Sequence, residues 1–258
     1  MSKQSLLNYW DLWRMFFRSF FIQAVWNYHS LLSIGFCYTL VPAAKRIFKE
    51  KGERIKFLCR HLNFFNAHPY FASFAIGAIV RVEEDQQVSR QPDPGKVERL
   101  KNALIGPLGA IGDQVFWASI KPSSVLVAVL GILIFKELHW QLIFLGLMLL
   151  IYNIPHFFIR IAGIRKGYQL GFEVYKVLNL DEYMNLKKLF GAMGAIALGS
   201  IGGFSLLKFG QVDWLQGIMF LVSAGSAYYF WKWRQNFYQA VLLALLAVMV
   251  FSLIMEVL

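Results

Sequence analysis

The chain has 258 residues, of which 57% are hydrophobic and only 16% are charged. This apolar content far exceeds what the core of a soluble domain of this length needs, so an ordinary soluble protein is excluded. The formal net charge is +11, but the basic residues gather in short connectors between apolar runs, as in the cytoplasmic loops of membrane proteins. The composition therefore predicts a membrane protein and no binding of nucleic acid.

The first amphipathic stretch covers residues 8–21 and mixes aromatic side chains with Asp11, Arg14 and Arg18. Aromatic and basic residues in this combination are typical of a helix that lies in the membrane interface. We therefore predict an N-terminal interfacial amphipathic helix, with residues 1–18 forming an arm of the protein.

The apolar run Ser19–Ala44 follows, and it is long enough to span the hydrocarbon layer, for which about 20 residues suffice. Gln23 and Asn27 lie one helical turn apart within this run, so a helix would place both amides on one face. An amide face does not favour contact with lipid. It either lines a polar path or contacts a partner helix inside the membrane.

The first polar segment is His61-Leu-Asn-Phe-Phe-Asn-Ala-His-Pro-Tyr70, an apolar stretch interrupted by polar side chains and a proline. At membrane depth, broken backbone is tolerated mainly where it is buried in protein or lines a cavity. Asn66 and His68 can donate and accept hydrogen bonds, as a polyhydroxylated ligand requires. The alternative is that they satisfy the backbone groups freed by Pro69. The segment has no Cys, Asp or Glu beside His68, so no metal site is expected there.

The second polar segment is Gly106-Pro-Leu-Gly-Ala-Ile-Gly-Asp113. Its glycines permit close approach of backbones. Asp113 is an ionisable group in an apolar stretch, which is costly at membrane depth and therefore indicates a specific role. The carboxylate either holds a sugar hydroxyl or caps a helix N-terminus. The Lys-Ser/Thr of a nucleotide-binding loop does not follow the glycines, so nucleotide binding is not expected.

Basic connectors flank both polar segments, so each segment either returns as a re-entrant hairpin or crosses the membrane once. Hairpins would break at Pro69 and at Gly106-Pro107, where the helical ladder loses a donor. Between the two segments, residues 83–101 contain acidic residues, prolines and a glycine, and they are expected to form a solvated loop.

Further spans follow in the second half of the chain. Residues 123–135 and 140–159 are predicted to form a helical pair, and a glycine-rich helix over Leu189–Leu207 is predicted to pack closely against another helix. The apolar run that contains the second helix of this pair is Leu138–Ile159, and two further spans are predicted at Trp214–Trp231 and Gln235–Met255. We expect one membrane domain over residues 1–258, with a core at 19–207 and C-terminal membrane helices at 208–258. No nucleophile with an adjacent base and no metal-ligand spacing is visible, so neither an enzyme nor a metal or cofactor site is predicted.

The two polar segments resemble signature stretches of the IID component of mannose-family sugar phosphotransferase systems. The resemblance extends from about residue 12 to about residue 205. It includes Phe16-Phe-Arg-Ser-Phe-Phe-Ile-Gln-Ala-Val-Trp-Asn-Tyr28, the acidic pair Glu83-Glu84, Asn153 and Gly167-Tyr168.

This resemblance implies an all-α polytopic bundle with interrupted or re-entrant helices in the bacterial cytoplasmic membrane. It implies a IIC membrane subunit as partner, soluble IIA and IIB phosphocarriers, a hexose or amino sugar as substrate, and a trimer of IIC–IID pairs. IID itself is not phosphorylated, so the chain would be a transport subunit without a cofactor. Carried over by position, the residues near the sugar are Gln23, Asn27, Asn66, His68 and Asp113.

One departure from the family pattern bears on this function. The chain has His29 directly after Trp26-Asn-Tyr28, where the family usually has a glutamate. The alternative function is therefore a regulatory or scaffold membrane subunit that keeps the IID fold without transport.

Overall fold

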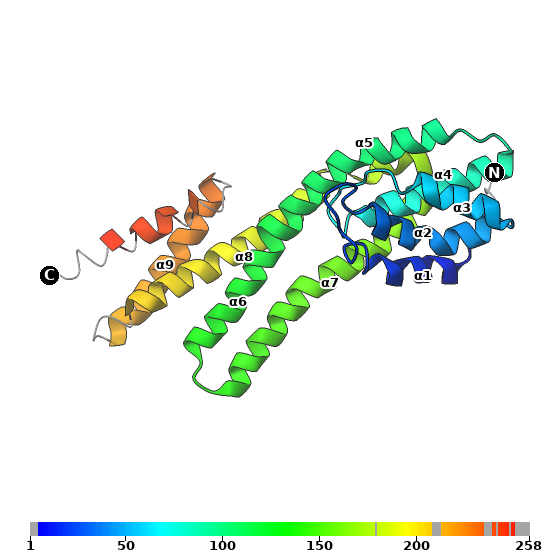
Figure 1. The fold of residues 1–258 in the computed structure, drawn as a ribbon. Coiled ribbons are helices and arrows are strands. Elements are labelled where there is room, and N and C mark those ends of the chain that lie inside the picture. Colours follow the sequence, from blue (N-terminus) through cyan, green and yellow to red (C-terminus); the bar gives the residue numbers. More distant parts are fainter. Residues whose placement is uncertain are drawn as a thin grey trace. The chain divides into compact units, whose positions relative to one another are not determined.

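The structure is a computed structural model that describes residues 5–178, 180–207, 213–234, 239–240, 242–247 and 249–250. The regular elements in these residues are helical (Figure 1), which confirms the predicted all-α architecture for this part of the chain. In chain order they are α1 (Tyr9–Ser19), α2 (Ser33–Ile47), α3 (Lys51–Arg60), α4 (Ala72–Ser89), α5 (Pro94–Gly112), a π-helical segment (Asp113–Ile120), α6 (Lys121–Ile134), α7 (Leu138–Leu170), a 3₁₀ segment (Gly171–Val177), α8 (Leu180–Leu207) and α9 (Asp213–Arg234).

The chain forms two compact units. The first unit contains Met1–Asp113 and Pro155–Leu180, and the second contains Gln114–Ile154 and Asp181–Leu258. Neither unit is a continuous stretch of sequence, because α7 contributes its second half to the first unit and its first half to the second unit.

Helix α4 is the centre of the first unit. Each residue from Ala72 to Glu84 is buried, which is the pattern of a helix surrounded on all sides by protein. Helix α7 approaches it backbone to backbone, since a Cβ added to Gly77 would lie 2.3 Å from the carbonyl oxygen of Ile164. A Cβ added to Gly167 would likewise lie 2.4 Å from the carbonyl oxygen of Phe74. Glycine is therefore required on both helices of this contact.

The predicted solvated loop over residues 83–101 is wrong. Helix α4 continues to Ser89, and α5 begins at Pro94. Glu83 and Glu84 are 2% and 0% exposed, although carboxylates almost never lie in a core unless they are paired. The reason is that each carboxylate has partners on a different neighbouring segment, which the linear sequence does not reveal.

Glu83 pairs with the C-terminal end of α3. Its carboxylate accepts a hydrogen bond from Nε of Arg60 at 2.7 Å and lies 3.0 Å from Nε2 of the buried His61. Burial lowers the pKa of His61 below its ordinary value, although the contact with Glu83 opposes this shift. Burial alone would raise the pKa of Glu83, but hydrogen bonds from His61 and Arg60 outweigh burial and lower it. The carboxylate is therefore ionised and the imidazole neutral.

Glu84 has its main partners on α7 and on the N-terminal segment. Its carboxylate accepts hydrogen bonds from the Tyr168 hydroxyl and from the backbone N–H of Leu6, and it lies 3.5 Å from Nη1 of Arg81. The Tyr168 hydroxyl also lies 2.7 Å from the Ser5 hydroxyl. Glu84 thus ties the N-terminal segment to α4 and α7.

The predicted single span Ser19–Ala44 is also wrong. Helix α1 begins with a capping box, in which the side chains of Asn8 and Asp11 exchange hydrogen bonds with each other's backbone, and it ends at Ser19. Residues 20–32 then form turns before α2 begins at Ser33. The polar side chains in this stretch stabilise turns rather than a helix face, as described for Asn27 below.

The two polar segments differ in conformation. Residues 61–71 are not helical, which confirms the interruption predicted near Pro69. Helix α5, in contrast, runs through Pro107, and the chain stays helical to Ile134 by way of the π-helical segment Asp113–Ile120. Of the two alternatives for this segment, the hairpin at Gly106-Pro107 is therefore wrong. A π-helical stretch is a known way for a helix to absorb a local disruption without a turn.

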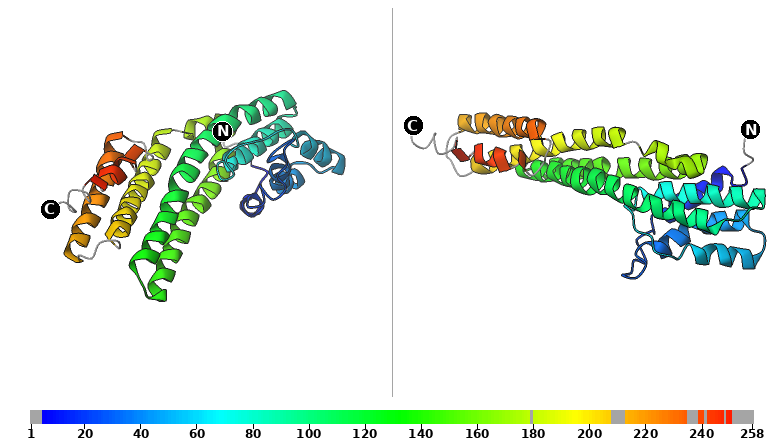
Figure 2. Two further views of the ribbon diagram at one scale, coloured as in Figure 1. Left: turned by 60° about the vertical axis from the view of Figure 1, so that its left-hand side comes forward. Right: turned by 90° about the horizontal axis from the view of Figure 1, so that it is seen from above.

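The second unit contains two helical pairs. Helices α6 and α7 form the predicted pair, in which a Cβ on Gly131 would lie 2.2 Å from the ring of Phe144. Helices α8 and α9 lie side by side (Figure 2), and a Cβ on Gly199 would lie 2.5 Å from the carbonyl oxygen of Ser223. This contact confirms that the glycine-rich stretch packs closely against another helix.

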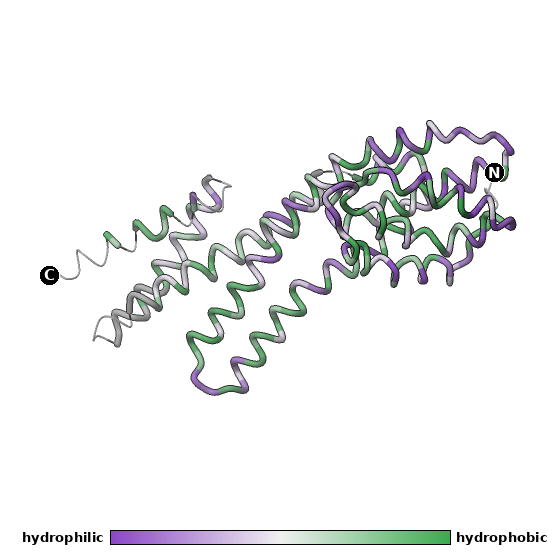
Figure 3. The backbone as a smooth tube through the Cα atoms, viewed as in Figure 1, coloured by the Kyte–Doolittle hydropathy of each residue, from purple (hydrophilic) through white to green (hydrophobic). Residues whose placement is uncertain are grey.

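Two helical stretches, Pro94–Ile134 and Leu138–Val177, are long and apolar enough to cross a membrane. Only 11% of the most apolar window of the second stretch is buried within the chain, so its apolar side chains face outward. Hydrophobic residues run along α6 and the first part of α7, and hydrophilic residues lie at their connection (Figure 3). This distribution suits a pair of membrane-spanning helices. The predicted span Gln235–Met255 lies partly outside the described residues.

The pairing of Glu83 with His61 predicts a pH dependence of stability. The folded-state pKa of His61 is lower than its ordinary value of 6.5. The neutral imidazole therefore contributes to the stability of the fold above this pH, and this stability is lost as the pH falls. The loss has an upper limit of about 1.4 kcal/mol per pH unit. We expect the melting temperature in detergent to fall between pH 7.5 and pH 5.5, and His61→Gln to reduce this slope, because glutamine keeps an N–H donor without titrating in this range.

His139→Gln is the matched control, because His139 is exposed in the first turn of α7. An equal slope in the wild type and His61→Gln would contradict the assignment of a neutral buried imidazole.

Candidate functional site

The predicted helical face of Gln23 and Asn27 does not exist. The Asn27 side chain closes a turn, because its Oδ1 accepts hydrogen bonds from the backbone N–H groups of His29 at 3.0 Å and Ser30 at 2.9 Å. This is the local capping role that asparagine commonly has in turns. Gln23 is exposed in the preceding turn, where its carbonyl oxygen accepts from the N–H of Trp26.

The turn at Asn27 is joined to the first polar segment by main-chain hydrogen bonds. The N–H of Leu32 donates to the carbonyl of Phe65 at 2.9 Å, and the N–H of Phe65 donates to the carbonyl of Ser30 at 3.4 Å. The Phe65 side chain is fully buried and packs 4.3 Å from the ring of Phe36 on α2. Two stretches separated in sequence by α2 and α3 therefore lie against each other.

His68 supports the backbone at the start of α4. Its Nδ1 accepts from the N–H of Tyr70 at 3.3 Å, and its carbonyl oxygen accepts from the N–H of Ala72 at 2.9 Å. The side chain is buried, whereas Asn66 is exposed two residues earlier. The alternative predicted for this segment, in which polar side chains satisfy broken backbone, is thus realised by His68.

The second polar segment packs directly on the first. A Cβ added to Gly112 would lie 2.2 Å from Cβ of His68, while a Cβ added to Gly109 would lie 4.0 Å from Cα of Ala67. Gly112 is therefore the position at which α5 needs a glycine to contact His68. The structure brings the two predicted segments together through this contact.

Asp113 follows Gly112 and is exposed. Its backbone is helical, with φ −63° and ψ −43°, and the chain is helical on both sides of it. Asp113 is therefore not an N-cap residue, since an N-cap has non-helical backbone angles. Of the two predicted roles, the structure thus does not bear out the helix cap.

Two buried cations near these segments were not among the predicted site residues, and Lys101 on α5 is the first. It is 2% exposed, and its Nζ donates to the backbone carbonyls of His61 at 3.1 Å and Asn63 at 2.7 Å. These bonds fix the start of the first polar segment and complement the C-terminal end of α3. Lys101 was missed because it falls in the stretch that was predicted as a solvated loop.

Arg160 on α7 is the second buried cation that was not among the predicted site residues. It donates to the carbonyl and hydroxyl oxygens of Ser19, the latter at 2.9 Å. Its guanidinium lies 4.9 Å from the ring centre of Tyr70 and 5.0 Å from that of Phe20. The ring of His156 lies 4.6 Å from that of Tyr70. The available signal was a charged residue directly after an apolar run, which marks a functional position in membrane helices.

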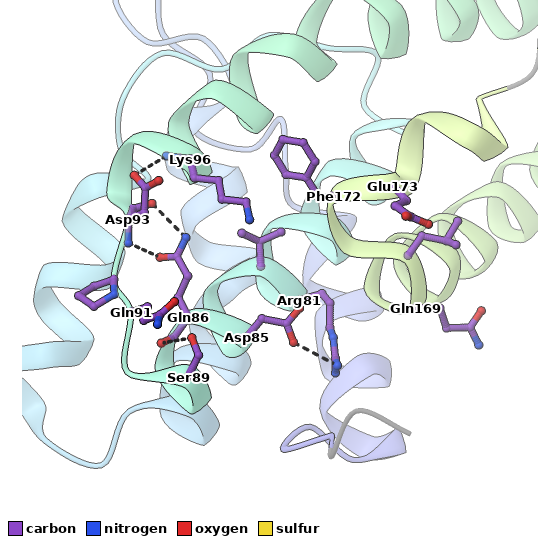
Figure 4. Close-up of a pocket in the computed structure, with 13 residues that line it drawn as sticks. Arg81, Asp85, Gln86, Ser89, Gln91, Asp93, Lys96, Gln169, Phe172 and Glu173 are labelled. Atoms are coloured by element: carbon purple, nitrogen blue, oxygen red, sulfur yellow. Dashed lines mark hydrogen bonds and ion pairs between the residues drawn. The ribbon is translucent and has the colours of Figure 1, made fainter. Parts of the chain in front are cut away.

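A polar pocket of about 730 Å³ lies elsewhere in the first unit, between α4, the α4–α5 connection and the 3₁₀ segment (Figure 4). Its charges are largely paired within the chain. Arg81 contacts Asp85 at 3.1 Å, and the side chain of Gln86 exchanges hydrogen bonds with the backbone of Asp93. None of the five predicted site residues lines this pocket. This pocket is therefore separate from the contact between the two polar segments.

Comparison with known families gives a match over nearly the whole chain. A sequence profile described as "PTS system mannose/fructose/sorbose family IID component" matches residues 7–258. The mannose-specific EIID component of the Escherichia coli (strain K12) PTS system is 29% identical over 192 residues, which cover 74% of this chain and 66% of that protein. The chain therefore aligns with just under two thirds of the length of this relative. The fructose permease IID component of Bacillus subtilis (strain 168) is 27% identical over 203 residues, covering 78% of this chain and 71% of that protein.

A solved structure is similar as well. A chain in the cryo-electron-microscopy structure of the mannose transporter ManYZ in complex with microcin E492 has a TM-score of 0.57 and 29% sequence identity. The similarity covers 80% of this chain and 73% of that chain. The helical fold described above is therefore shared with a known membrane transporter.

The contact between Gly112 and His68 predicts a large difference between two neighbouring glycines. Gly112→Ala should displace the His68 side chain and destabilise the protein by about 1–3 kcal/mol through overpacking. Gly109→Ala should have little effect, because a Cβ there makes only ordinary van der Waals contact. The melting temperature of each variant in detergent measures this difference.

A double variant tests the cause. In Gly112→Ala/His68→Gly the clash is removed, because glycine lacks the Cβ atom that a side chain at position 112 would meet, so the double variant should be more stable than the sum of the two single effects implies. Additive effects would contradict a direct contact between the two polar segments.

Proposed function

Because this chain belongs to the IID component family of the mannose/fructose/sorbose phosphotransferase systems, we propose that it is a membrane subunit of a sugar permease. It forms the translocation path together with a IIC subunit, and uptake is coupled to phosphorylation of the sugar by a IIB protein, which IIA supplies with phosphate. The chain itself is a transport subunit and performs no phosphoryl transfer. The family match over residues 7–258 supports this proposal. The observation that carries it is the contact that places Asn66, His68 and Asp113 in two adjoining segments.

The five residues have different tasks in this proposal. Asn66 and Asp113 are exposed, and their amide and carboxylate groups match the hydroxyl groups of a hexose or amino sugar. Gln23 lies at the edge of the same path. His68 and Asn27 act indirectly. Their side chains accept hydrogen bonds from backbone N–H groups and so stabilise the backbone that carries the contacting residues.

The surface around the Asn27 turn suits a partner subunit. Tyr28 is 91% exposed, and Trp26 and Phe64 are about half exposed. Aromatic side chains in such positions are enriched at protein interfaces. We therefore place IIC against this surface, in a trimer of IIC–IID pairs in the bacterial cytoplasmic membrane.

The test is sugar uptake by cells that produce the chain with its cognate IIC and no other IID protein. Asn66→Ala and Asp113→Asn should each lower uptake about tenfold, because the loss of one hydrogen bond to a buried ligand group costs roughly 1–3 kcal/mol. Gln87→Ala is the control, since it removes an exposed amide near the far end of α4. Wild-type uptake by both site variants, across a panel of hexoses and amino sugars, would overturn the proposed contacts.

His29 separates transport from the alternative function. The side chain is exposed at the turn that Asn27 closes, so His29→Glu can restore a carboxylate without disturbing the core. For a transport subunit we expect this variant to change the rate or the sugar preference of uptake at least threefold, about 0.6 kcal/mol. Absence of uptake by both forms, with both present in the membrane, would favour a regulatory or scaffold subunit.

A further inference from the structure

A basic pocket of about 510 Å³ lies between α1 and α2, both in the first unit. It is lined by Arg14 and Arg18 of α1 and by Lys45 and Arg46 of α2, with Asp11 as its one carboxylate. The pocket belongs neither to the proposed sugar path nor to the surface around Asn27. Its size is in the range of pockets that hold small ligands.

The three arginines of the pocket have contacts within the chain. Oδ2 of Asp11 accepts from Nε of Arg46 at 3.0 Å, and Oδ1 of Asp11 lies 3.7 Å from Nη1 of Arg14. Arg18 donates to the carbonyl of Tyr38 at 3.1 Å and stacks 4.4 Å from the centre of its ring. Asp11 is itself 5% exposed and accepts from the N–H of Asn8. The only carboxylate is thus committed to organising the pocket, while the guanidinium groups keep further donors.

The charge in the pocket remains positive after these contacts. Four cations face one carboxylate, which leaves a net charge of about +3. Arg18 lies in the last turn of α1 and Lys45 and Arg46 lie in the last turn of α2, and each helix C-terminus contributes about half a negative charge. A net charge of roughly +2 therefore remains, which is enough to attract and neutralise the single negative charge of a phosphodiester group.

The outward face of α1 places this pocket at a membrane surface. Trp10 and Phe17 are 69% and 60% exposed, and their spacing puts them on one side of the helix together with Arg14. Phe21, in the turn that follows α1, is 57% exposed. A helix with an exposed aromatic face beside basic residues lies in the plane of the interface, with its aromatic rings among the acyl chains. The adjoining basic residues then lie at the depth of the lipid headgroups.

We propose that the pocket between α1 and α2 binds the phosphate group of an anionic phospholipid, and that this contact anchors α1 in the interface. The aromatic face of α1 packs on the acyl chains of the same lipid. The inference rests on the membrane location of the chain and does not depend on the sugar path. A soluble phosphate compound presents the same phosphate group, so the test has one arm for each source.

The experiment is a titration of the full-length chain in neutral detergent with dioleoylphosphatidylglycerol, dioleoylphosphatidylcholine or inorganic phosphate, with the melting temperature as readout. We expect phosphatidylglycerol to stabilise the wild type and to bind at least tenfold more tightly than phosphatidylcholine. In Arg14→Gln/Lys45→Gln the affinity for phosphatidylglycerol should fall about 30-fold, because each basic residue at an anionic surface is worth about fivefold.

Two further variants make the result specific. Lys51→Gln/Lys56→Gln removes the same charge from exposed positions on α3 and should keep wild-type affinity. Arg14→Lys/Lys45→Arg keeps the charge in the pocket and should retain most of the binding, which separates a lost site from a misfolded protein. Equal loss in the α3 variant, equal binding of both lipids, or equal stabilisation by inorganic phosphate alone would overturn the proposal of a lipid site.

Discussion

The burial of α4 from Ala72 to Glu84 is the constraint on which the rest of the first unit depends. A helix that is surrounded by protein on every side must satisfy each polar group it carries, and α4 carries two adjacent carboxylates. Glu83 is satisfied by α3, and Glu84 is satisfied by Tyr168 of α7 and by the N-terminal segment. The acidic pair thus links α4 to three other parts of the chain. These links set the position of the first polar segment, which leads directly into α4.

The first polar segment shows how irregular backbone is kept in one conformation without a regular element. Lys101 holds its start, the pairing of Phe65 with the Asn27 turn holds its middle, and His68 with Gly112 holds its end. These contacts come from α5 and from the Asn27 turn, so the segment is ordered by tertiary structure alone. Its exposed groups can therefore be pre-organised for a ligand, which reduces the entropy that binding must overcome.

The same chain presents two kinds of basic residue, and their surroundings give them different tasks. Lys101 and Arg160 are buried and bond to backbone carbonyls, so they stabilise the fold around the first polar segment. Arg14 and Lys45 lie at the surface and keep donors available for a ligand. A count of positive charge in the sequence includes both the buried and the surface basic residues, although only the surface residues contribute to recognition of an anionic surface. The net charge of +11 is therefore a poor guide to partners without the structure.

The sequence by itself determined the class of protein, the helical pair of α6 and α7, the amphipathic α1 and the interruption near Pro69. These features follow from composition, periodicity and the missing N–H of proline, which are local properties. Only the tertiary structure decided that Glu83 and Glu84 are buried, that α5 runs through Pro107, and that Asn27 closes a turn. When the neighbours in the fold are unknown, a charged residue is predicted to be exposed, and a helix-breaking residue is predicted to end a helix. Its partners come from distant segments, and their hydrogen bonds offset the cost of burying it.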